Sequence, residues 1–293
     1  MSVKSLIKSL TPPILLDAAR SLRTQASKTL SSPYRHYAIG RFDAKLNRDH
    51  ALPRIRARYP LYDRFLPFLA GRLPGRGAII DVGANVGDTL LLMLNERTPA
   101  DETLFVCAEP DPDYFALMKE NAAQPMAEGY QIILENAFIS RSKDDRITVK
   151  HAGTATSVKV STIERERERE FYTLCLTLPE LMEKHAIASR LLTLVKVDTD
   201  GWDWDCVMSL GDALRTASPL IYWEHWCETP EQHEGYSEML DYLEEMGFGA
   251  FAVFDNVGHL IFTLDADRVK SYHRYLLKAL RGEARLNYGD GYY

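Results

Sequence analysis

The segment IIDVGANVGDT, residues 79–89, constrains the fold more than any other part of the chain. An apolar run ends at Asp81, two glycines follow at Gly83 and Gly87, and a second apolar run begins directly after them. This order predicts a buried strand, a tight turn and the start of a helix, because glycine enters left-handed backbone conformations without steric cost. A turn of this kind at the end of a strand is a common place for nucleotide-like ligands.

Strand-like and helix-like segments alternate from residue 78 onward. The expected strands are residues 78–82, 103–109, 130–138, 145–151, 191–199 and 218–226. The expected helices are residues 87–97, 111–123, 176–186 and 230–247. A hairpin around the turn DNVG closes the series at residues 248–264. The alternation predicts an α/β fold with a doubly wound, mostly parallel, seven-stranded Rossmann-like sheet and an antiparallel strand near the C-terminus.

The first 75 residues differ from the rest in pattern and in charge. Apolar spacing on either side of Pro12 and Pro13 predicts two short helices that break at the prolines. The turn-forming segment LPGRG, residues 73–77, marks the start of the main domain. We therefore expect a basic helical N-terminal extension over residues 1–75 and a main domain over residues 76–293.

Charge is divided unevenly along the chain. Residues 1–58 carry 12 Lys and Arg against 3 Asp, a balance of +9, which leaves 23 basic and 38 acidic residues, or −15, for the remainder. An acidic main body argues against a nucleic-acid partner, because binding to phosphates needs clustered positive charge. The basic leader is expected either to contact an anionic membrane surface or to pack as a helix on the main domain.

Several classes of protein are disfavoured by composition. No apolar run approaches the roughly 20 residues that cross a bilayer, and the N-terminus lacks the apolar core of a secretory signal. We expect a cytoplasmic protein, with peripheral contact to the inner face of the membrane as the alternative. The run ERERERE, residues 164–170, is expected to be a solvated segment. No metal-binding or disulfide spacing connects the four cysteines, which are Cys107, Cys175, Cys206 and Cys227.

The glycine turn does not match a dinucleotide fingerprint. The pattern GxGxxG requires a central glycine where Asn85 stands, so close approach of a diphosphate is disfavoured. Glu109 ends the second strand, where a carboxylate accepts hydrogen bonds from ribose hydroxyls; the alternative is an exposed carboxylate at the start of a helix. Asn136 ends the third strand and either meets an adenine edge or forms a turn.

The fourth strand ends in KVDTDGWDWD, residues 196–205. Charged groups at the end of a buried strand are costly to desolvate without a partner or ligand, which makes Asp198 a strong candidate site residue and Lys196 a candidate to neutralise or orient it. Asp200 and Asp203 either belong to the site or cap the following helix. Trp202 and Trp204 follow in the same segment. They either form a surface on which a sugar stacks or pack in the core.

The fifth strand ends in WEHW, residues 223–226. Glu224 and His225 project to opposite sides of an extended strand. His225 can accept a proton from an attacking hydroxyl near neutral pH, or it can be a satisfied histidine in an aromatic cluster. A divalent cation is a further hypothesis, with oxygen and nitrogen ligands from Asp198, Asp200, Glu224 and His225.

Taken together, these blocks resemble a known family. The spacing D-x-G-x-x-x-G is similar to that of S-adenosylmethionine-dependent methyltransferases, and KVDTDGWD matches the K-[IV]-D-x-[ED]-G-x-[ED] block of the FkbM-type enzymes. The resemblance covers about residues 75–265. It implies O-methylation of a hydroxyl, with S-adenosylmethionine as donor and a sugar, nucleotide-sugar or lipid-linked glycan as acceptor.

The resemblance also assigns roles to the candidate residues. Residues expected to catalyse the transfer are Asp198, Glu224 and His225, with Asp198 or His225 as the base. Residues expected to hold the cofactor are Asp81, Gly83, Ala84, Asn85, Gly87, Glu109, Asn136 and Asp198. Two rival hypotheses remain open: a nicotinamide-dependent oxidoreductase, and a noncatalytic scaffold that docks a glycan-synthesis complex through residues 1–58.

Overall fold

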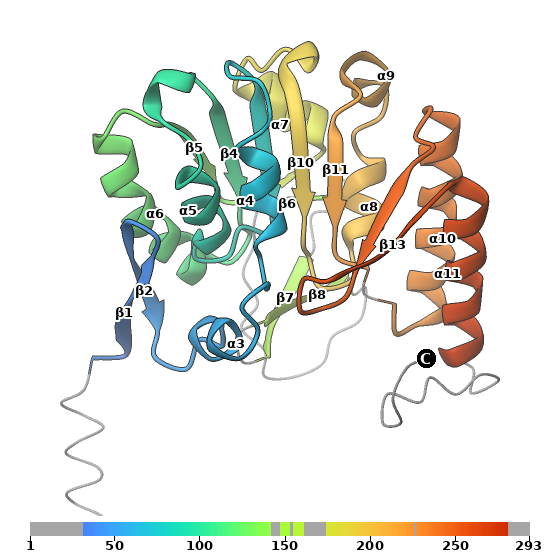
Figure 1. Cartoon of the computed structure of the whole chain (residues 1–293), viewed down its shortest axis with the longest axis horizontal. Coiled ribbons are helices and arrows are strands. Elements are labelled where there is room, and N and C mark those ends of the chain that lie inside the picture. Colours follow the sequence, from blue (N-terminus) through green and yellow to red (C-terminus); the bar gives the residue numbers. More distant parts are fainter. Residues whose placement is uncertain (1–31, 142–146, 153–154, 161–173, 226, 281–293) are drawn as a thin grey trace, which may run out of the picture.

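A computed structural model describes residues 32–141, 147–152, 155–160, 174–225 and 227–280 (Figure 1). The helices expected around Pro12 and Pro13 and the run at residues 164–170 lie outside the described residues. Within the described ranges, no helix is long and apolar enough to cross a membrane.

A five-stranded parallel sheet forms the centre of the molecule. Its strands lie in the order β11-β10-β3-β4-β5. The first half of the sheet comprises β3 (Ala78–Val82), β4 (Leu104–Ala108) and β5 (Gln131–Glu135), and the second half comprises β10 (Leu192–Val197) and β11 (Leu220–Trp223). β3 and β10 are neighbours although over 100 residues separate them, so the chain reverses its direction of winding between these two strands.

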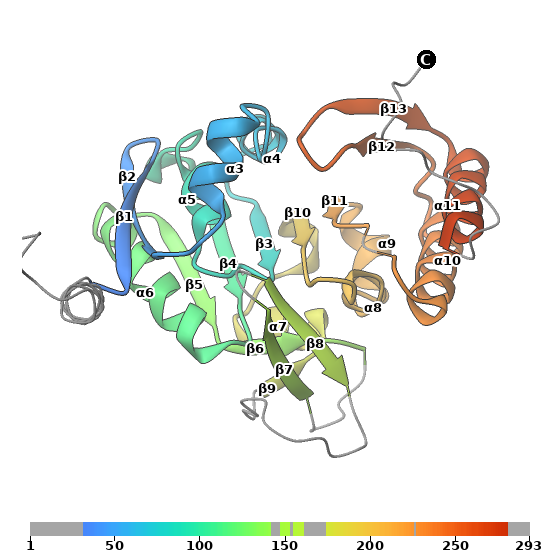
Figure 2. The same cartoon turned by 90° about the horizontal axis from the view of Figure 1, so that it is seen from below.

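Helices cover both faces of this sheet (Figure 1). They are α5 (Asp88–Leu94), α6 (Pro112–Ala127), α7 (Leu178–Lys184), α8 (Asp203–Met208), α9 (Ala213–Ala217) and α10 (Pro230–Glu245), while α11 (Ala266–Leu280) packs on the outer side of α10 (Figure 2). Side-chain caps fix three of their starts: Asp111 accepts hydrogen bonds from backbone N–H groups of α6, and Thr177 and Thr229 form capping boxes at α7 and α10.

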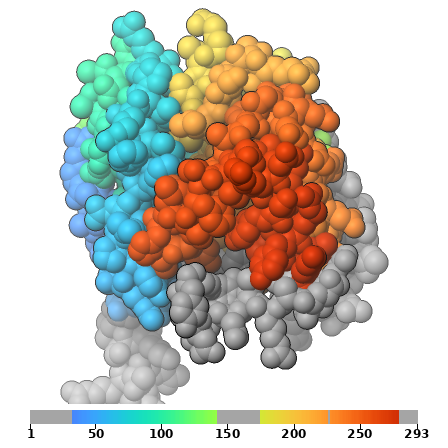
Figure 3. Space-filling view, turned by 45° about the vertical axis from the view of Figure 1, so that its right-hand side comes forward, coloured from blue at the N-terminus to red at the C-terminus, as the bar shows by residue number. Residues whose placement is uncertain are grey.

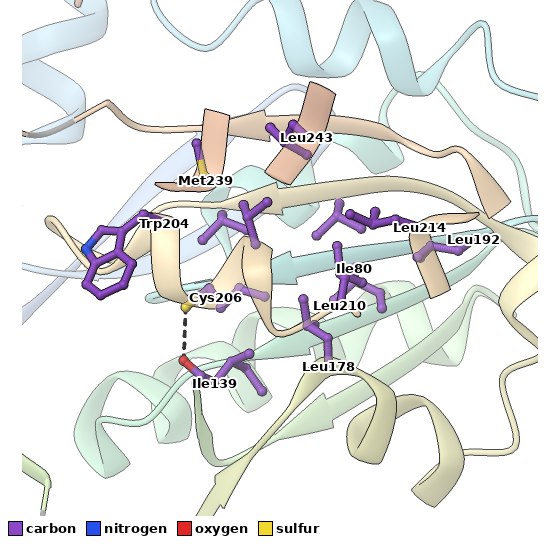
Figure 4. Close-up of a cluster of buried hydrophobic side chains, with 14 of the residues drawn as sticks. Ile80, Ile139, Leu178, Leu192, Trp204, Cys206, Leu210, Leu214, Met239 and Leu243 are labelled. Atoms are coloured by element: carbon purple, nitrogen blue, oxygen red, sulfur yellow. Dashed lines mark hydrogen bonds between the residues drawn. The ribbon is translucent and has the colours of Figure 1, made fainter. Parts of the chain in front are cut away.

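Two hydrophobic cores lie on opposite faces of the sheet. Because side chains alternate along a strand, Ile80 faces one core and Ile79 the other. Figure 4 shows the first core, where Ile80 lies beside Leu210. In the same core the thiol of Cys206 donates to the carbonyl oxygen of Ile139 at 2.9 Å. Burial on both faces explains why the strands of the sheet are apolar almost throughout.

The C-terminal hairpin corrects the expected strand number. β12 (Phe251–Phe254) and β13 (Leu260–Leu264) pair only with each other, so among the described residues the central sheet has five strands and not seven. An apolar cavity of about 200 Å³ separates the hairpin from β11. Trp223 and Phe251 both line this cavity, and the centroids of their rings are 6.4 Å apart.

The described part of the N-terminal extension begins with a hairpin, so the expected all-helical extension is not confirmed over residues 32–75. β1 (Tyr34–Ile39) and β2 (Phe42–Asn47) precede two short helices, α3 (Leu52–Arg58) and α4 (Phe65–Ala70). Strict alternation of buried and exposed residues in β2 favours a strand that covers an apolar surface. That surface belongs to α5 and α6, and the expected domain boundary near residue 75 stays a prediction.

Two smaller strand pairs lie beyond the end of the sheet. β6 (Ala137–Ile139) pairs with β9 (Leu174–Leu176), and β7 (Ile147–Ala152) pairs with β8 (Ala155–Val160). Figure 2 shows the β7–β8 hairpin projecting below the sheet on one side, with α3 and α4 on the other. The carboxyl ends of the central strands therefore lie between these two structures.

Candidate active site

The glycine turn after β3 lies directly against the end of β10. Gly83 has a φ of 72° and Gly87 a φ of 79°, both left-handed. A Cβ at Gly83 would overlap the carbonyl oxygen of Asp198, so only glycine fits. Ala84 packs in the second core, and its N–H donates to the carbonyl of Ala108. The predicted turn is confirmed, and it lies where the winding direction reverses, the usual ligand position in open α/β sheets.

A buried lysine joins the two strands beneath this turn. Lys196 Nζ lies 2.9 Å from Asp81 Oδ1 and 3.4 Å from Asp198 Oδ2, and it donates to the Gly83 carbonyl at 3.0 Å. Lys196 and Asp81 are almost fully buried, whereas half of the Asp198 side chain is exposed. Burial alone lowers the pKa of Lys196, but the carboxylates of Asp81 and Asp198 raise that pKa well above its usual range. The ammonium group is therefore charged and holds Asp198 at the open edge of the sheet.

Glu109 is held by the backbone of two loops. Its Oε2 accepts from the N–H of Asn85 at 2.8 Å, and its Oε1 accepts from the N–H of Asp111 at 2.9 Å. Burial raises the pKa of Glu109 to about 7, although these two N–H groups oppose the rise. The alternative of an exposed helix-starting carboxylate is wrong, because the side chain is 3% exposed and Asp111 is the residue that caps α6.

The raised pKa of Glu109 predicts that stability depends on pH. The folded protein holds the Glu109 proton up to about pH 7, whereas the unfolded chain loses it near pH 4.5. The contribution of this group to the unfolding free energy is therefore largest below pH 4.5 and is lost as pH rises to about 7. The cost of ionisation in the fold is about 3 kcal/mol. Glu109→Gln does not titrate, so between pH 4.5 and 8 the unfolding free energy of the wild type should fall by about this much more than that of the variant.

Urea unfolding of both proteins across this range checks the prediction. Asp203 also has a pKa raised to about 7 by burial, and its contribution cancels because it is common to both proteins. Parallel pH curves for wild type and Glu109→Gln would contradict the burial of an ionisable Glu109.

Asn136 and Asp203 organise loops around the site. The Asn136 amide donates to the carbonyls of Glu109 at 2.7 Å and Pro110 at 3.0 Å, and so fixes the loop after β4. Asp203 is fully buried and accepts from the N–H of Gly201 at 3.2 Å. Asp200 has a φ of 52°, and its turn leads the chain from β10 into α8. Trp204 belongs to the first core, and the partly buried Trp202 packs against that core.

Glu224 follows the end of β11, and its N–H donates to the carbonyl of Val197 at the end of β10 at 3.1 Å. Burial raises its pKa to about 8, with further contributions from the carboxylates of Asp198 and Asp203. Among the described residues, no hydrogen-bond partner reaches its buried Oε2. Glu224 therefore adds a carboxyl group with a raised pKa to the group around Asp198.

His225 belongs to a histidine cluster. Its Nδ1 accepts from Nε1 of Trp223 at 3.3 Å, and its Nε2 lies 3.0 Å from Nδ1 of His273, whose Nε2 donates to the carbonyl of His233 at 2.9 Å. Burial lowers the pKa of His225 to about 3, and His273 adds to this effect. Both ring nitrogens of His225 have hydrogen-bond partners, from Trp223 on β11 and His273 on α11. This arrangement fits the alternative of a satisfied histidine in an aromatic cluster.

Residues that the sequence did not single out also reach this edge. The connection between α3 and α4 carries Tyr62 and Asp63; burial and then neighbouring carboxylates, including Asp198, raise the pKa of both. Tyr222 on β11 has a pKa raised to about 12 by burial first and then by Asp63 and Asp198. No local pattern marks Tyr62 or Asp63, because they approach the site only through the tertiary fold.

A cavity beside the glycine turn is the place where a cofactor would bind. It is lined by Val82, Gly83, Asn85, Glu109, Pro110, Ala137, Phe138, Ile139, Asp198, Thr199 and Asp200. None of these described lining residues is Lys or Arg, and three carry carboxyl groups. That lining fits a positively charged sulfonium compound with ribose hydroxyls and opposes a pyrophosphate. The cavity holds only about 40 Å³, so most of a nucleoside would lie in its mouth.

The divalent-cation hypothesis receives no support. Over the described ranges, no group of three or more His, Cys, Asp or Glu side chains is arranged to hold a metal ion. Asp198 is paired with Lys196, and the ring nitrogens of His225 are engaged elsewhere, so the four expected ligands do not converge.

Sequence comparison decides the family. The FkbM methyltransferase domain matches residues 81–249, which is more than half of the chain and includes the glycine turn, Glu109, Lys196, Asp198 and Glu224. The chain belongs to the FkbM methyltransferase family. FkbM family membership makes it an S-adenosylmethionine-dependent methyltransferase, in place of the nicotinamide-dependent oxidoreductase weighed from the sequence. No curated protein matches this FkbM sequence significantly.

Solved structures of methyltransferases are distantly similar to this FkbM protein. A precorrin-6y C5,15-methyltransferase from Geobacter metallireducens aligns with a TM-score of 0.37 at 12% identity, over 65% of this chain and 73% of its own. A methyltransferase from Agrobacterium tumefaciens aligns with a TM-score of 0.41 at 8% identity, over 80% of this chain and 68% of its own. A methyltransferase from Aquifex aeolicus aligns with a TM-score of 0.36 at 12% identity, over 72% of this chain and 95% of its own. The assignment rests on the family match alone.

Proposed function

We propose that this protein transfers a methyl group from S-adenosylmethionine to a hydroxyl of a sugar or glycan precursor, such as a nucleotide-sugar or a lipid-linked glycan. The observation that carries the proposal is the cavity at the glycine turn, where carboxyl groups and no basic side chains meet the end of β10. The acceptor class follows from the resemblance to FkbM-type enzymes and from the carboxyl and phenol groups around Asp198, which bind hydroxyls well.

The donor side is assigned to the glycine turn and Glu109. S-adenosylmethionine supplies a methyl group on a positively charged sulfur. The Glu109 carboxylate lines the cavity and retains acceptor capacity beyond its two backbone N–H partners, so it suits a ribose diol. Asp81, Gly83 and Gly87 shape the turn, with Ala84 anchoring it in the core.

Asp198 is the proposed base. The acceptor oxygen forms a bond to the methyl carbon as the carbon–sulfur bond breaks, and the hydroxyl proton passes to Asp198 Oδ. Asp198 lines the donor cavity, is half exposed and is held by Lys196 at 3.4 Å. Glu224 is proposed to hydrogen-bond the acceptor. His225 is not proposed as the base, because both of its ring nitrogens are engaged.

Calorimetry and methyl transfer test this assignment. The wild type should bind S-adenosylmethionine, and Glu109→Ala should weaken binding roughly 10- to 100-fold through loss of charged hydrogen bonds. Asp198→Asn should lower the transfer rate roughly 100-fold or more, measured with labelled S-adenosylmethionine and a glycan extract. Full activity in Asp198→Asn would remove it as the base. Mass spectrometry of surface glycans from cells without the gene should show one residue lighter by a CH₂ group.

A noncatalytic scaffold is the second candidate. The basic N-terminal segment favours it as a docking element, and a peripheral membrane contact through residues 1–58 belongs to the same proposal. A protein that binds S-adenosylmethionine but transfers no methyl group to any glycan extract would favour the scaffold.

A further inference from the structure

The connection between α3 and α4, residues 59–64, is fixed against the edge of the sheet by the C-terminal hairpin. Gly258 lies so close that a Cβ there would overlap the carbonyl oxygen of Leu61. The rings of Phe65 and Phe254 stack at a tilt with centroids 4.2 Å apart. Figure 3 shows the hairpin surface, coloured orange, meeting the blue surface of this N-terminal segment. Elements from both ends of the described chain thus hold this connection in place.

Asp63 and Tyr62 lie two and three residues before Phe65, which lines a cavity together with Tyr222 near the carboxyl end of β11. The side chains of Asp63 and Tyr62 are half-buried, and Asp63 has a left-handed φ of 56°. Burial raises the pKa of Asp63 to about 7; the carboxylates of Asp88 and Asp198 add to the rise, and Lys196 and Arg56 oppose it. The carboxyl group of Asp63 therefore lies within the field of the buried lysine.

Asp198 belongs to two sets of groups. It lines the donor cavity together with Gly83 and Glu109. The second set, none of which lines that cavity, comprises the groups whose pKa values Asp198 raises: Tyr62, Asp63, Tyr222 and Glu224. An in-line transfer requires the acceptor oxygen and the sulfur on opposite sides of the methyl carbon, which makes the second set the candidate acceptor side.

We infer that residues 59–64 form the acceptor wall of the active site and that Asp63 binds a hydroxyl of the acceptor beside Asp198. This inference rests on the proposed function and adds the acceptor contact that the family motifs do not supply. A carboxyl group near a second carboxyl group, with two phenols nearby, recognises a polyol with neighbouring hydroxyls, because each hydroxyl both donates and accepts. Because its pKa is raised to about 7, the carboxyl group of Asp63 can act near neutral pH as a hydrogen-bond donor or as an acceptor.

Asp63→Asn tests the acceptor wall with little disturbance of the backbone. Asparagine tolerates the left-handed conformation as aspartate does, whereas alanine would add strain. We expect kcat/KM for methyl transfer to a panel of methyl glycosides and a glycan extract to fall roughly 10- to 100-fold. Affinity for S-adenosylmethionine, measured by calorimetry, should stay within about twofold. Tyr62→Phe should raise KM more than it lowers kcat.

Asp43, earlier in the N-terminal part of the chain, is a matched control. It is exposed on β2 and pairs with His36 at 2.7 Å, so Asp43→Asn should leave kcat/KM and the affinity for S-adenosylmethionine unchanged. Wild-type kcat/KM in Asp63→Asn would overturn the inference. A loss of affinity for S-adenosylmethionine in Asp63→Asn would also overturn it, because Asp63 would then contribute to cofactor binding or to folding.

A second measurement needs no acceptor. With S-adenosylhomocysteine bound, a carbodiimide and glycine ethyl ester should still label Asp63, located by peptide mass spectrometry, and the labelled protein should keep its affinity for S-adenosylhomocysteine. Protection of Asp63 by S-adenosylhomocysteine, or no labelling in either state, would overturn the acceptor wall. If the wild type methylates no glycoside and no extract while Asp63 labels as expected, the glycan function fails and the acceptor wall stands.

Discussion

Gly83→Ala is expected to lower the unfolding free energy by about 3 kcal/mol or more and to abolish binding of S-adenosylmethionine. The new Cβ would overlap the carbonyl oxygen of Asp198 and come within 2.9 Å of its carbonyl carbon. Backbone on both sides cannot give way as a flexible side chain would. The turn after β3 and the end of β10 would move apart, which disrupts the cavity and the Lys196 contact with the Gly83 carbonyl.

Gly247→Ala is the matched control for this clash. Gly247 has a left-handed φ of 94°, and a Cβ there would meet nothing within 4 Å. Its substitution carries backbone strain without overlap and should cost about 1 kcal/mol with cofactor binding intact. Urea unfolding and calorimetry on both variants separate the two effects. Equal losses in the two proteins would show that close packing at Gly83 has no role.

Lys196→Met is expected to cost about 3–5 kcal/mol, because it leaves the buried Asp81 carboxylate without its cation. Asp81 is 1% exposed, and burial already raises its pKa against the opposing effect of Lys196. Without the lysine its pKa in the folded state rises further. The loss in stability, measured by urea unfolding, should therefore shrink as pH falls and Asp81 becomes protonated.

The double variant Lys196→Met/Asp81→Asn identifies the cause. Removing both charges should recover most of the lost stability, since no buried charge remains. Arg268→Met removes one partner of an exposed ion pair with Asp265 and should cost less than about 1 kcal/mol. A cost for Lys196→Met as small as that of Arg268→Met, or no recovery in the double variant, would contradict the buried-pair account.

The parallel part of the fold was predictable because its signals are local. The strand at residues 78–82 and the strand at 191–199 both appear in the sheet, and the glycine turn follows the first of them as expected. The position of Asp198 at the carboxyl end of β10 followed from the same apolar run. Each of these expectations depends on a pattern within about ten residues, which the backbone reproduces wherever the segment is placed.

The missed features depend on contacts between distant segments. Residues 248–264 were expected to complete the sheet, but β12 and β13 pair with each other and a cavity lies between this hairpin and β11. For His225 the sequence left a general base and a clustered histidine open, and the contacts of its ring with His273 and Trp223 fit the cluster. Apolar and polar side chains alternate in residues 34–47, as they do in a pair of strands. The basic composition of the segment obscured this signal.

By itself, the sequence determined the strand–turn–helix at residues 78–94, the parallel sheet that follows from it, and the family. Only the tertiary structure decided that Lys196 is shared between Asp81 and Asp198, and that the connection carrying Asp63 packs against the C-terminal hairpin. The physical reason is that hydrophobic periodicity and glycine turns specify backbone locally, whereas the partner of a buried charge is set by which strands become neighbours. Here those neighbours, β3 and β10, lie more than 100 residues apart in the chain.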